Sequence, residues 1–156
     1  MFRTMRRIDR QVTTEESAHI LRKCEYGVLS TVNQDGYPCG VPISYVYIDG
    51  SIYFHSAGKG YKLDNIAYNK KVSFCVVGQK KTLPAIFSTS YESVIAFGTA
   101  SQVEGEEKMA ALLALIDKYT PDFRDKGKEY AQSGGGQTTV IKITVEHMTG
   151  KVRPPQ

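Results

Sequence analysis

Residues 49–63, with the sequence DGSIYFHSAGKGYKL, are the stretch from which the rest of the chain can be organised. An Asp49-Gly50 turn signal leads into a β-like run at 51–55, and a loop of small residues then opens a helix-like run at 63–68. Such a loop often holds a phosphate, because free backbone N–H groups, the helix dipole and a lysine all favour an anion. The alternative interpretation is a surface loop with two solvated lysines.

The composition predicts one soluble globular domain spanning residues 1–156. Apolar residues make up 41% of the chain and charged residues 23%, and no apolar run is long enough to cross a bilayer. The basic N-terminus is not followed by an apolar core, so we expect no secretory signal and a cytoplasmic location.

The net charge is compatible with a small anionic ligand, and the cysteine spacing favours neither a metal site nor disulfides. The net charge of +4 comes mostly from scattered basic residues, with no basic run to mark a nucleic-acid groove, and it suits a small anionic ligand equally well. The three cysteines are far apart and form no CxxC pair, so neither a zinc site nor a disulfide framework is expected.

Hydrophobic patterning around the opening stretch predicts strands and short helices. Thr13 and Glu16 fit a capping box for a helix at 14–24, and Met109, Leu112, Leu113 and Ile116 mark a second amphipathic helix that Pro121 ends. We expect an irregular loop at 78–90 and a glycine spacer at 134–136. Six strands are predicted, at 27–32, 38–48, 51–55, 71–77, 91–103 and 138–145.

Two residues within these strands predict irregularities. Pro42 favours an edge position or a bulge, and Gly98 a bulge or a bend. Hairpin-linked strands followed by strands and short helices predict a mainly β (α+β) fold, an antiparallel barrel with short flanking helices packed outside it.

The order of several segments resembles a known family. Gly36-Tyr-Pro-Cys-Gly-Val-Pro-Ile-Ser-Tyr45 precedes Asp49-Gly-Ser-Ile-Tyr-Phe-His-Ser-Ala57 and Gly60-Tyr-Lys-Leu63; later come Tyr91-Glu-Ser-Val94, Gly98 and Met148-Thr-Gly-Lys151. Together they resemble the FMN-binding split β-barrel superfamily related to pyridoxamine 5'-phosphate oxidase, and within it the branch of 5-nitroimidazole-resistance (Nim-type) proteins. The resemblance covers nearly the whole chain.

This resemblance implies a fold, a cofactor and an activity. It implies a six-stranded split barrel, a homodimer with FMN at the subunit interface, and oxidoreductase chemistry. Members of the Nim branch reduce nitroimidazole drugs, and His55 occupies the position of their active-site histidine. A nitroimidazole or another small, flat, electron-poor nitroaromatic is therefore the expected substrate, with neither nucleic acid nor membrane as a partner.

The loop residues are the expected phosphate ligands. Lys62 lies in the first predicted helical turn, where its charge adds to the field at the helix N-terminus. Ser56 and the backbone around Ala57 and Gly60 can donate hydrogen bonds to the same group. His55, at the end of the strand, is expected at the rim of the flavin site as a hydrogen-bond or proton donor. The alternatives are a solvated lysine and a histidine with a structural hydrogen bond.

Two further groups of residues are expected near the flavin ring. Pro42, Ile43, Ser44 and Tyr45 belong to the strand that runs beside the flavin in this family, and Ser44 is the predicted side-chain contact. Ser93 lies in a segment that the family places near the dimer interface and the partner's flavin. Lys151, past the last predicted strand, is expected near the flavin N1–C2 region, where its charge would stabilise the anionic reduced form; the alternative is a solvated tail. Arg153 is expected in a solvated tail beyond the last strand.

Two other functions remain open from the sequence. A pyridoxamine-phosphate oxidase would need a second phosphate-binding loop, and none is evident in the sequence. A non-catalytic split barrel that binds flavin, deazaflavin or haem is the alternative from another class, with His55 as an axial ligand if haem is bound.

Overall fold

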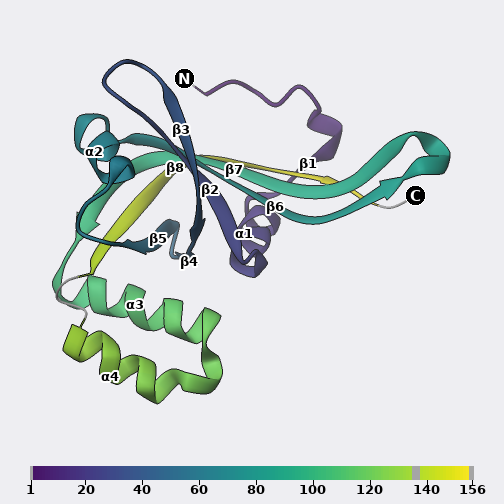
Figure 1. Ribbon diagram of the computed structural model, residues 1–156. Helices are drawn as coiled ribbons and strands as arrows, with labels where there is room; N and C mark the ends of the chain where they lie inside the picture. The colour runs from purple at the N-terminus through teal and green to yellow at the C-terminus, as the bar shows by residue number, and fades with distance from the viewer. Residues whose placement is uncertain (1, 135–137, 155–156) are drawn as a thin grey trace.

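An antiparallel sheet forms the body of the computed structural model, which describes residues 2–134 and 138–154 (Figure 1). Its eight strands are β1 (Gln11–Val12), β2 (Tyr26–Val32), β3 (Pro38–Ser44), β4 (Val46–Ile48), β5 (Ser51–Ser56), β6 (Lys71–Leu83), β7 (Ser88–Val103) and β8 (Thr139–Arg153). The helices are α1 (Thr14–Lys23), α2 (Tyr61–Tyr68), α3 (Gly105–Tyr119) and α4 (Arg124–Gly134), with short 3-10 turns at Ile8–Arg10, Pro84–Ile86 and Pro121–Phe123.

The strand order shows where the barrel is split. The sheet runs β3-β2-β6-β7-β8-β5-β4, with β1 attached to β8, and every pairing is antiparallel. β3 and β4 lie at the two ends of this path, although only Tyr45 separates them in the chain. The split therefore lies between β3 and β4, and the one-residue connection through Tyr45 brings these two ends together to complete the predicted split barrel.

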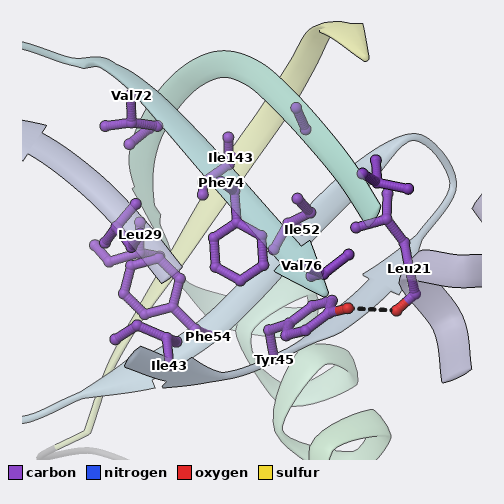
Figure 2. Packing of buried hydrophobic residues seen from close by; sticks show 14 of the residues in the cluster. Leu21, Leu29, Ile43, Tyr45, Ile52, Phe54, Val72, Phe74, Val76 and Ile143 are labelled. Carbon is purple, nitrogen blue, oxygen red and sulfur yellow. Dashed lines mark hydrogen bonds between the residues drawn. The ribbon is translucent and has the colours of Figure 1, made fainter. Parts of the chain in front are cut away.

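The structure has two strands more than the predicted six, because the short β1 was not predicted and the run at 38–48 is broken at Tyr45. The Tyr45 ring is fully buried and its Oη donates to the Leu21 carbonyl at 2.6 Å (Figure 2). The Tyr45 N–H donates to Tyr119 Oη at 2.8 Å, and Lys118 Nζ donates to the Tyr45 carbonyl at 2.9 Å. These partners from α3 replace strand pairing at Tyr45, so one predicted strand becomes β3 and β4.

Two apolar clusters hold the fold together. Figure 2 shows the larger one inside the barrel, where Tyr45 and Phe74 meet edge to face with ring centroids 4.8 Å apart. The smaller cluster lies between α3 and the barrel and consists of Val46, Tyr53, Val103, Ala111, Leu115 and Val140. Burying a side chain of this size contributes about 1.5–3 kcal/mol.

The predicted helices and turns are present, with shifted limits. Thr13 caps α1 through both bonds of the capping box with Glu16. The predicted Asp49-Gly50 turn is confirmed by positive φ values of 45° and 77°, and a register shift at Phe97/Gly98 confirms the predicted bulge. In α3 the fully buried positions are Ala111 and Leu115, and the predicted stripe is only half-buried.

Two expectations about irregular segments are wrong, and a third falls mostly outside the described residues. Residues 78–90 are no irregular loop, because β6 and β7 continue as a hairpin to the pair Leu83–Ser88. Residues 150–153 are no tail but the end of β8, paired with β7 and β1. The polar α4 was not predicted, and of the predicted spacer Gly134 ends that helix while 135–136 lie outside the described residues. No helix in the described part of the chain is long and apolar enough to cross a membrane.

Candidate active site

The link between β5 and α2 contains an unsatisfied hydroxyl. Ser56 is buried, and its Oγ has no hydrogen-bond partner among the described residues. A buried polar atom without a partner costs about 1–3 kcal/mol, so such atoms are rare in folded proteins. The position of Ser56 at the end of β5 therefore indicates a site that a ligand completes.

The start of α2 adds further free donors beside Ser56. Gly60 precedes the helix with φ 143°, a conformation that favours glycine, and no side chain caps the helix. A Cβ at Gly60 would meet no atom within 4 Å, so the backbone here is open to a ligand. Lys62 is half-buried and forms no ion pair within residues 2–134 and 138–154. These donors and this charge fit a phosphate group.

His55 faces a hollow on the other side of β5. Side chains alternate along a strand, so His55 and Ser56 point to opposite faces. Tyr53, on the face of His55, is buried beneath α3 and donates to Glu107 Oε1 at 2.8 Å, whereas His55 is exposed. The hollow has a volume of about 370 Å³ and is lined by Ser44, His55, Leu112, Leu115, Ile116, Tyr119, Thr120, Tyr130, Ala131 and Thr138.

The predicted flavin-facing strand contributes alternate residues to this region. Pro42 and Ser44 are exposed on β3, and Ser44 lines the hollow together with His55. The side chains of Ile43 and Tyr45 belong to the barrel core. Because Lys118 and Tyr119 already bind the Tyr45 backbone, we do not place Tyr45 among the cofactor contacts.

Ser93 and Lys151 lie next to each other but far from His55. They are register partners on β7 and β8. On β8, Val140 pairs with His55 and Lys151 lies eleven residues further on, a separation of about 36 Å along the strand. Within one subunit the predicted site residues therefore form two groups at opposite ends of β8.

A family model agrees with this architecture. The model described as Pyridoxamine 5'-phosphate oxidase matches residues 13–152, nearly the whole chain. The chain belongs to the pyridoxamine 5'-phosphate oxidase family. No curated protein matches it.

Solved structures place this family member among split barrels. A candidate 5-nitroimidazole antibiotic resistance protein from Bacteroides thetaiotaomicron is similar, with 25% identity, a TM-score of 0.74 and coverage of 91% of this chain and 86% of that one. A conserved hypothetical protein from Mycobacterium tuberculosis has 21% identity, a TM-score of 0.82 and coverage of 98% and 96%. An FAD and haem binding protein from Mycobacterium smegmatis has 18% identity, a TM-score of 0.80 and coverage of 94% and 74%.

The end of the sheet that holds Ser93 and Lys151 has partners for its polar groups within the chain. Arg10 Nη1 donates to Tyr91 Oη at 3.1 Å, and Lys151 Nζ lies 5.5 Å from the centroid of the Tyr91 ring. Desolvation raises the pKa of Tyr91, but its contacts with Arg10 and Lys151 outweigh this effect and hold the pKa below its usual value. Glu92, the residue after Tyr91, accepts a hydrogen bond from Lys23 Nζ at its Oε2, at 2.8 Å. In this family member the side chains of Tyr91 and Glu92, which precede Ser93, therefore have partners within the chain.

Sequence reasoning predicted α3, but it missed α4 and the contacts that α3 makes with the Tyr45 region beside the hollow. Lys118 Nζ donates to the Cys24 carbonyl at 2.7 Å as well as to Tyr45, and desolvation lowers the pKa of this lysine. Its partners are backbone carbonyls that lie far away in sequence, so no motif could have revealed them. The polar composition of α4 likewise hides Tyr130 and Ala131, which close one side of the hollow.

Proposed function

We propose that this protein is a homodimeric, FMN-dependent oxidoreductase that reduces a small, flat, electron-poor molecule such as a nitroimidazole or another nitroaromatic. The observation that carries the proposal is the unpartnered, buried Ser56 hydroxyl beside the uncapped start of α2 and the unpaired Lys62, within the described residues. Family membership and the similarity to the candidate nitroimidazole resistance protein support the choice of cofactor and substrate.

The β5–α2 link would hold the FMN phosphate. Ser56 Oγ donates one hydrogen bond, the backbone at Ala57 and Gly60 supplies N–H groups, and Lys62 supplies the charge. β3 pairs with β2 alone, so along Pro42–Ser44 its other edge has free N–H and C=O groups for the polar edge of the ring. Bound FMN supplies reversible transfer of electrons and hydride, which protein side chains do not offer.

The hollow would hold the substrate. Leu112, Leu115 and Ile116 offer an apolar wall that excludes water from a flat ring. Ser44 Oγ and His55 lie on the same hollow and provide the polar contacts that orient a nitro group. Histidine is the most common general acid in enzymes, so His55 can pass a proton to a substrate oxygen that gains electrons.

A second copy of the chain is part of the proposal for two reasons. Val28, Cys75 and Ile95 are register partners across β2, β6 and β7, and with Val77 and Phe97 they form an apolar outer face. An apolar face of this kind is typical of a subunit interface. Since Ser93 and Lys151 lie far from His55 in one subunit, they can contribute to a flavin site only across a dimer.

Absorption spectroscopy and light scattering test this proposal. We expect purified protein, or apoprotein incubated with FMN, to show flavin absorbance in a particle of twice the chain mass. Under anaerobic conditions, dithionite-reduced holoprotein should be reoxidised by 2-methyl-5-nitroimidazole. Protein that stays colourless after incubation with FMN contradicts the proposed cofactor, and a Soret band in its place assigns haem.

A further inference from the structure

We propose that the hairpin formed by residues 80–90, the arm, reaches across to a second copy of this chain and packs its tip residue Phe87 over the partner's hollow. This inference rests on the proposed homodimer and adds a residue to its site. It follows from the exposure of the arm, its direction and its chemistry.

In the described part of the chain the arm is a two-stranded hairpin with no third strand beside it, and only Ser90 near its base is buried. Tyr91 is the last β7 residue paired with β8, and beyond it only β6 and β7 pair, from Lys80–Tyr91 to Leu83–Ser88. Figure 1 shows this hairpin extending beyond the rest of the sheet. Two-stranded hairpins are marginally stable alone in water. A partner surface would supply the missing contacts.

The tip of the arm exposes a large apolar side chain in a strained conformation. Phe87 is 99% exposed and has φ 48°, which is rare for a bulky residue, and Ile86 beside it is also exposed. Exposing such a large apolar side chain to water is unfavourable. An exposed aromatic side chain on a projecting hairpin is instead typical of an anchor that packs against a partner surface.

The direction of the arm follows from the two groups of site residues. Figure 1 shows the arm and the α3–α4 pair at opposite ends of the subunit. A two-fold dimer that brings Ser93 and Lys151 to the partner's β5–α2 link must therefore pack the outer faces of the two subunits against each other, with the subunits pointing in opposite directions. The arm continues β7 from Ser93 to Ser88, about 17 Å further. In such a dimer the arm lies over the partner's β5–α2 link and the hollow beside the partner's His55.

The chemistry of the two surfaces matches. The hollow offers an apolar wall from α3 and α4 to Phe87 and Ile86. The arm carries Lys80 and Lys81 and no acidic residue, whereas residues 104–134 contain seven acidic and five basic residues. Opposite charges of this kind favour pairing of the arm with the helix pair and orient it.

Photocrosslinking from the tip tests the inference on the intact protein. A photoreactive benzoylphenylalanine replaces Phe87, and this chain is mixed with isotope-labelled wild-type chain before irradiation. We expect crosslinks from position 87 to the peptides of the labelled copy that line the hollow, which are residues 105–134 and the segments around Ser44, His55 and Thr138. Crosslinks confined to the same chain, or to other segments of the labelled copy, overturn the inference.

A variant provides an independent readout. Because each dimer buries two Phe87 side chains, Phe87→Ser should weaken dimerisation by at least about 100-fold. Tyr37→Ser, which removes another exposed aromatic side chain, is the matched control and should leave dimerisation unchanged. Unchanged dimerisation in Phe87→Ser overturns the inference, as does Phe87-dependent binding to phosphatidylserine vesicles with an unchanged dimer.

Wild-type protein separates this inference from the proposed function. Wild-type chain that is monomeric or binds no FMN contradicts the proposed function itself. If the wild-type chain forms an FMN-bound dimer but the crosslinks from position 87 fall outside the segments that line the partner's hollow, the role of the arm alone is contradicted.

Discussion

The two ends of β8 differ in how their polar groups are satisfied. At the end that pairs with His55, Ser56 Oγ has no hydrogen-bond partner and Lys62 no ion pair in the described residues, and His55 is exposed beside a hollow. At the end that holds Lys151, Tyr91 and Glu92 are each bonded to a cation from the N-terminal region. Unsatisfied groups indicate where a ligand binds, whereas satisfied groups indicate structure within one subunit.

This difference assigns distinct roles to the two ends. The first end, termed the loop end, should respond to mutation mainly through ligand binding and turnover. The second, termed the arm end, should respond through stability and through contacts with a second copy.

The largest effect is expected from His55→Ala. General acid catalysis contributes about 100-fold or more to rate, so reoxidation of the reduced flavoprotein by 2-methyl-5-nitroimidazole should slow by at least about 100-fold. FMN affinity should stay within about twofold, because His55 and Ser56 face opposite sides of β5. Stopped-flow absorbance and flavin titration measure the two quantities.

The control for His55 is the exposed His19 on α1. His19→Ala should leave both quantities unchanged. If His55→Ala also reoxidises at the wild-type rate, His55 is a structural residue and the hollow is not where protons are delivered.

Lys62→Ala is expected to have the next largest effect. A charge-assisted contact to phosphate is worth about 1.5–3 kcal/mol, so the dissociation constant for FMN should rise by about 10- to 150-fold. Lys59→Ala, which changes an exposed lysine in the loop just before α2, should alter it by less than about threefold. Equal losses in the two variants would mean that the loop acts only through its overall charge.

Ser56→Ala should have opposite effects on the apoprotein and on FMN binding. Removing a buried hydroxyl without a partner should leave the apoprotein as stable as wild type, or more stable by up to about 1 kcal/mol. The same change should weaken FMN binding by about fivefold. Urea unfolding and flavin titration give the two values.

The buried Ser17 is the matched control, since its Oγ donates to the Thr13 carbonyl at 2.8 Å. Ser17→Ala should destabilise the apoprotein by about 1 kcal/mol without changing FMN affinity. A Ser56→Ala apoprotein that is destabilised like Ser17→Ala would show that Ser56 already has a partner in solution.

Local patterns predicted the loop end well. The Asp49-Gly50 turn, the following strand, the small-residue loop and the helix are contiguous, so short-range signals were sufficient to place Ser56, Gly60 and Lys62 together. The capping box of Thr13 was predicted for the same reason. Split-barrel topology came from the order of family-like segments, since no local pattern states which strands pair.

Long-range contacts explain what the sequence did not predict. The break at Tyr45 depends on Leu21, Lys118 and Tyr119, which reach it from distant segments. The arm was expected to be a loop because Lys80, Lys81 and Pro84 obscure the alternation of a strand. The separation of Ser93 and Lys151 from His55 depends on strand register, which composition and spacing along the chain do not fix.

Lys23→Met should have the smallest effect, and it tests whether the arm end is held together within one subunit. Desolvation raises the pKa of Glu92, but the hydrogen bond from Lys23 and that from the Gln79 N–H outweigh it, so the pKa is lowered. A carboxylate with a lowered pKa stabilises the fold above its unfolded pKa, and this contribution is lost as the pH falls through the folded value.

The Lys23 side chain is 39% exposed, so the free energy of unfolding at pH 7 should drop by at most about 1 kcal/mol. The difference from wild type should vanish at low pH, where Glu92 is protonated, and shrink in 1 M salt, while FMN affinity stays the same. A deficit that is constant across this pH range would assign the role of Lys23 to packing of its aliphatic chain and would remove the ion pair from the account of the arm end.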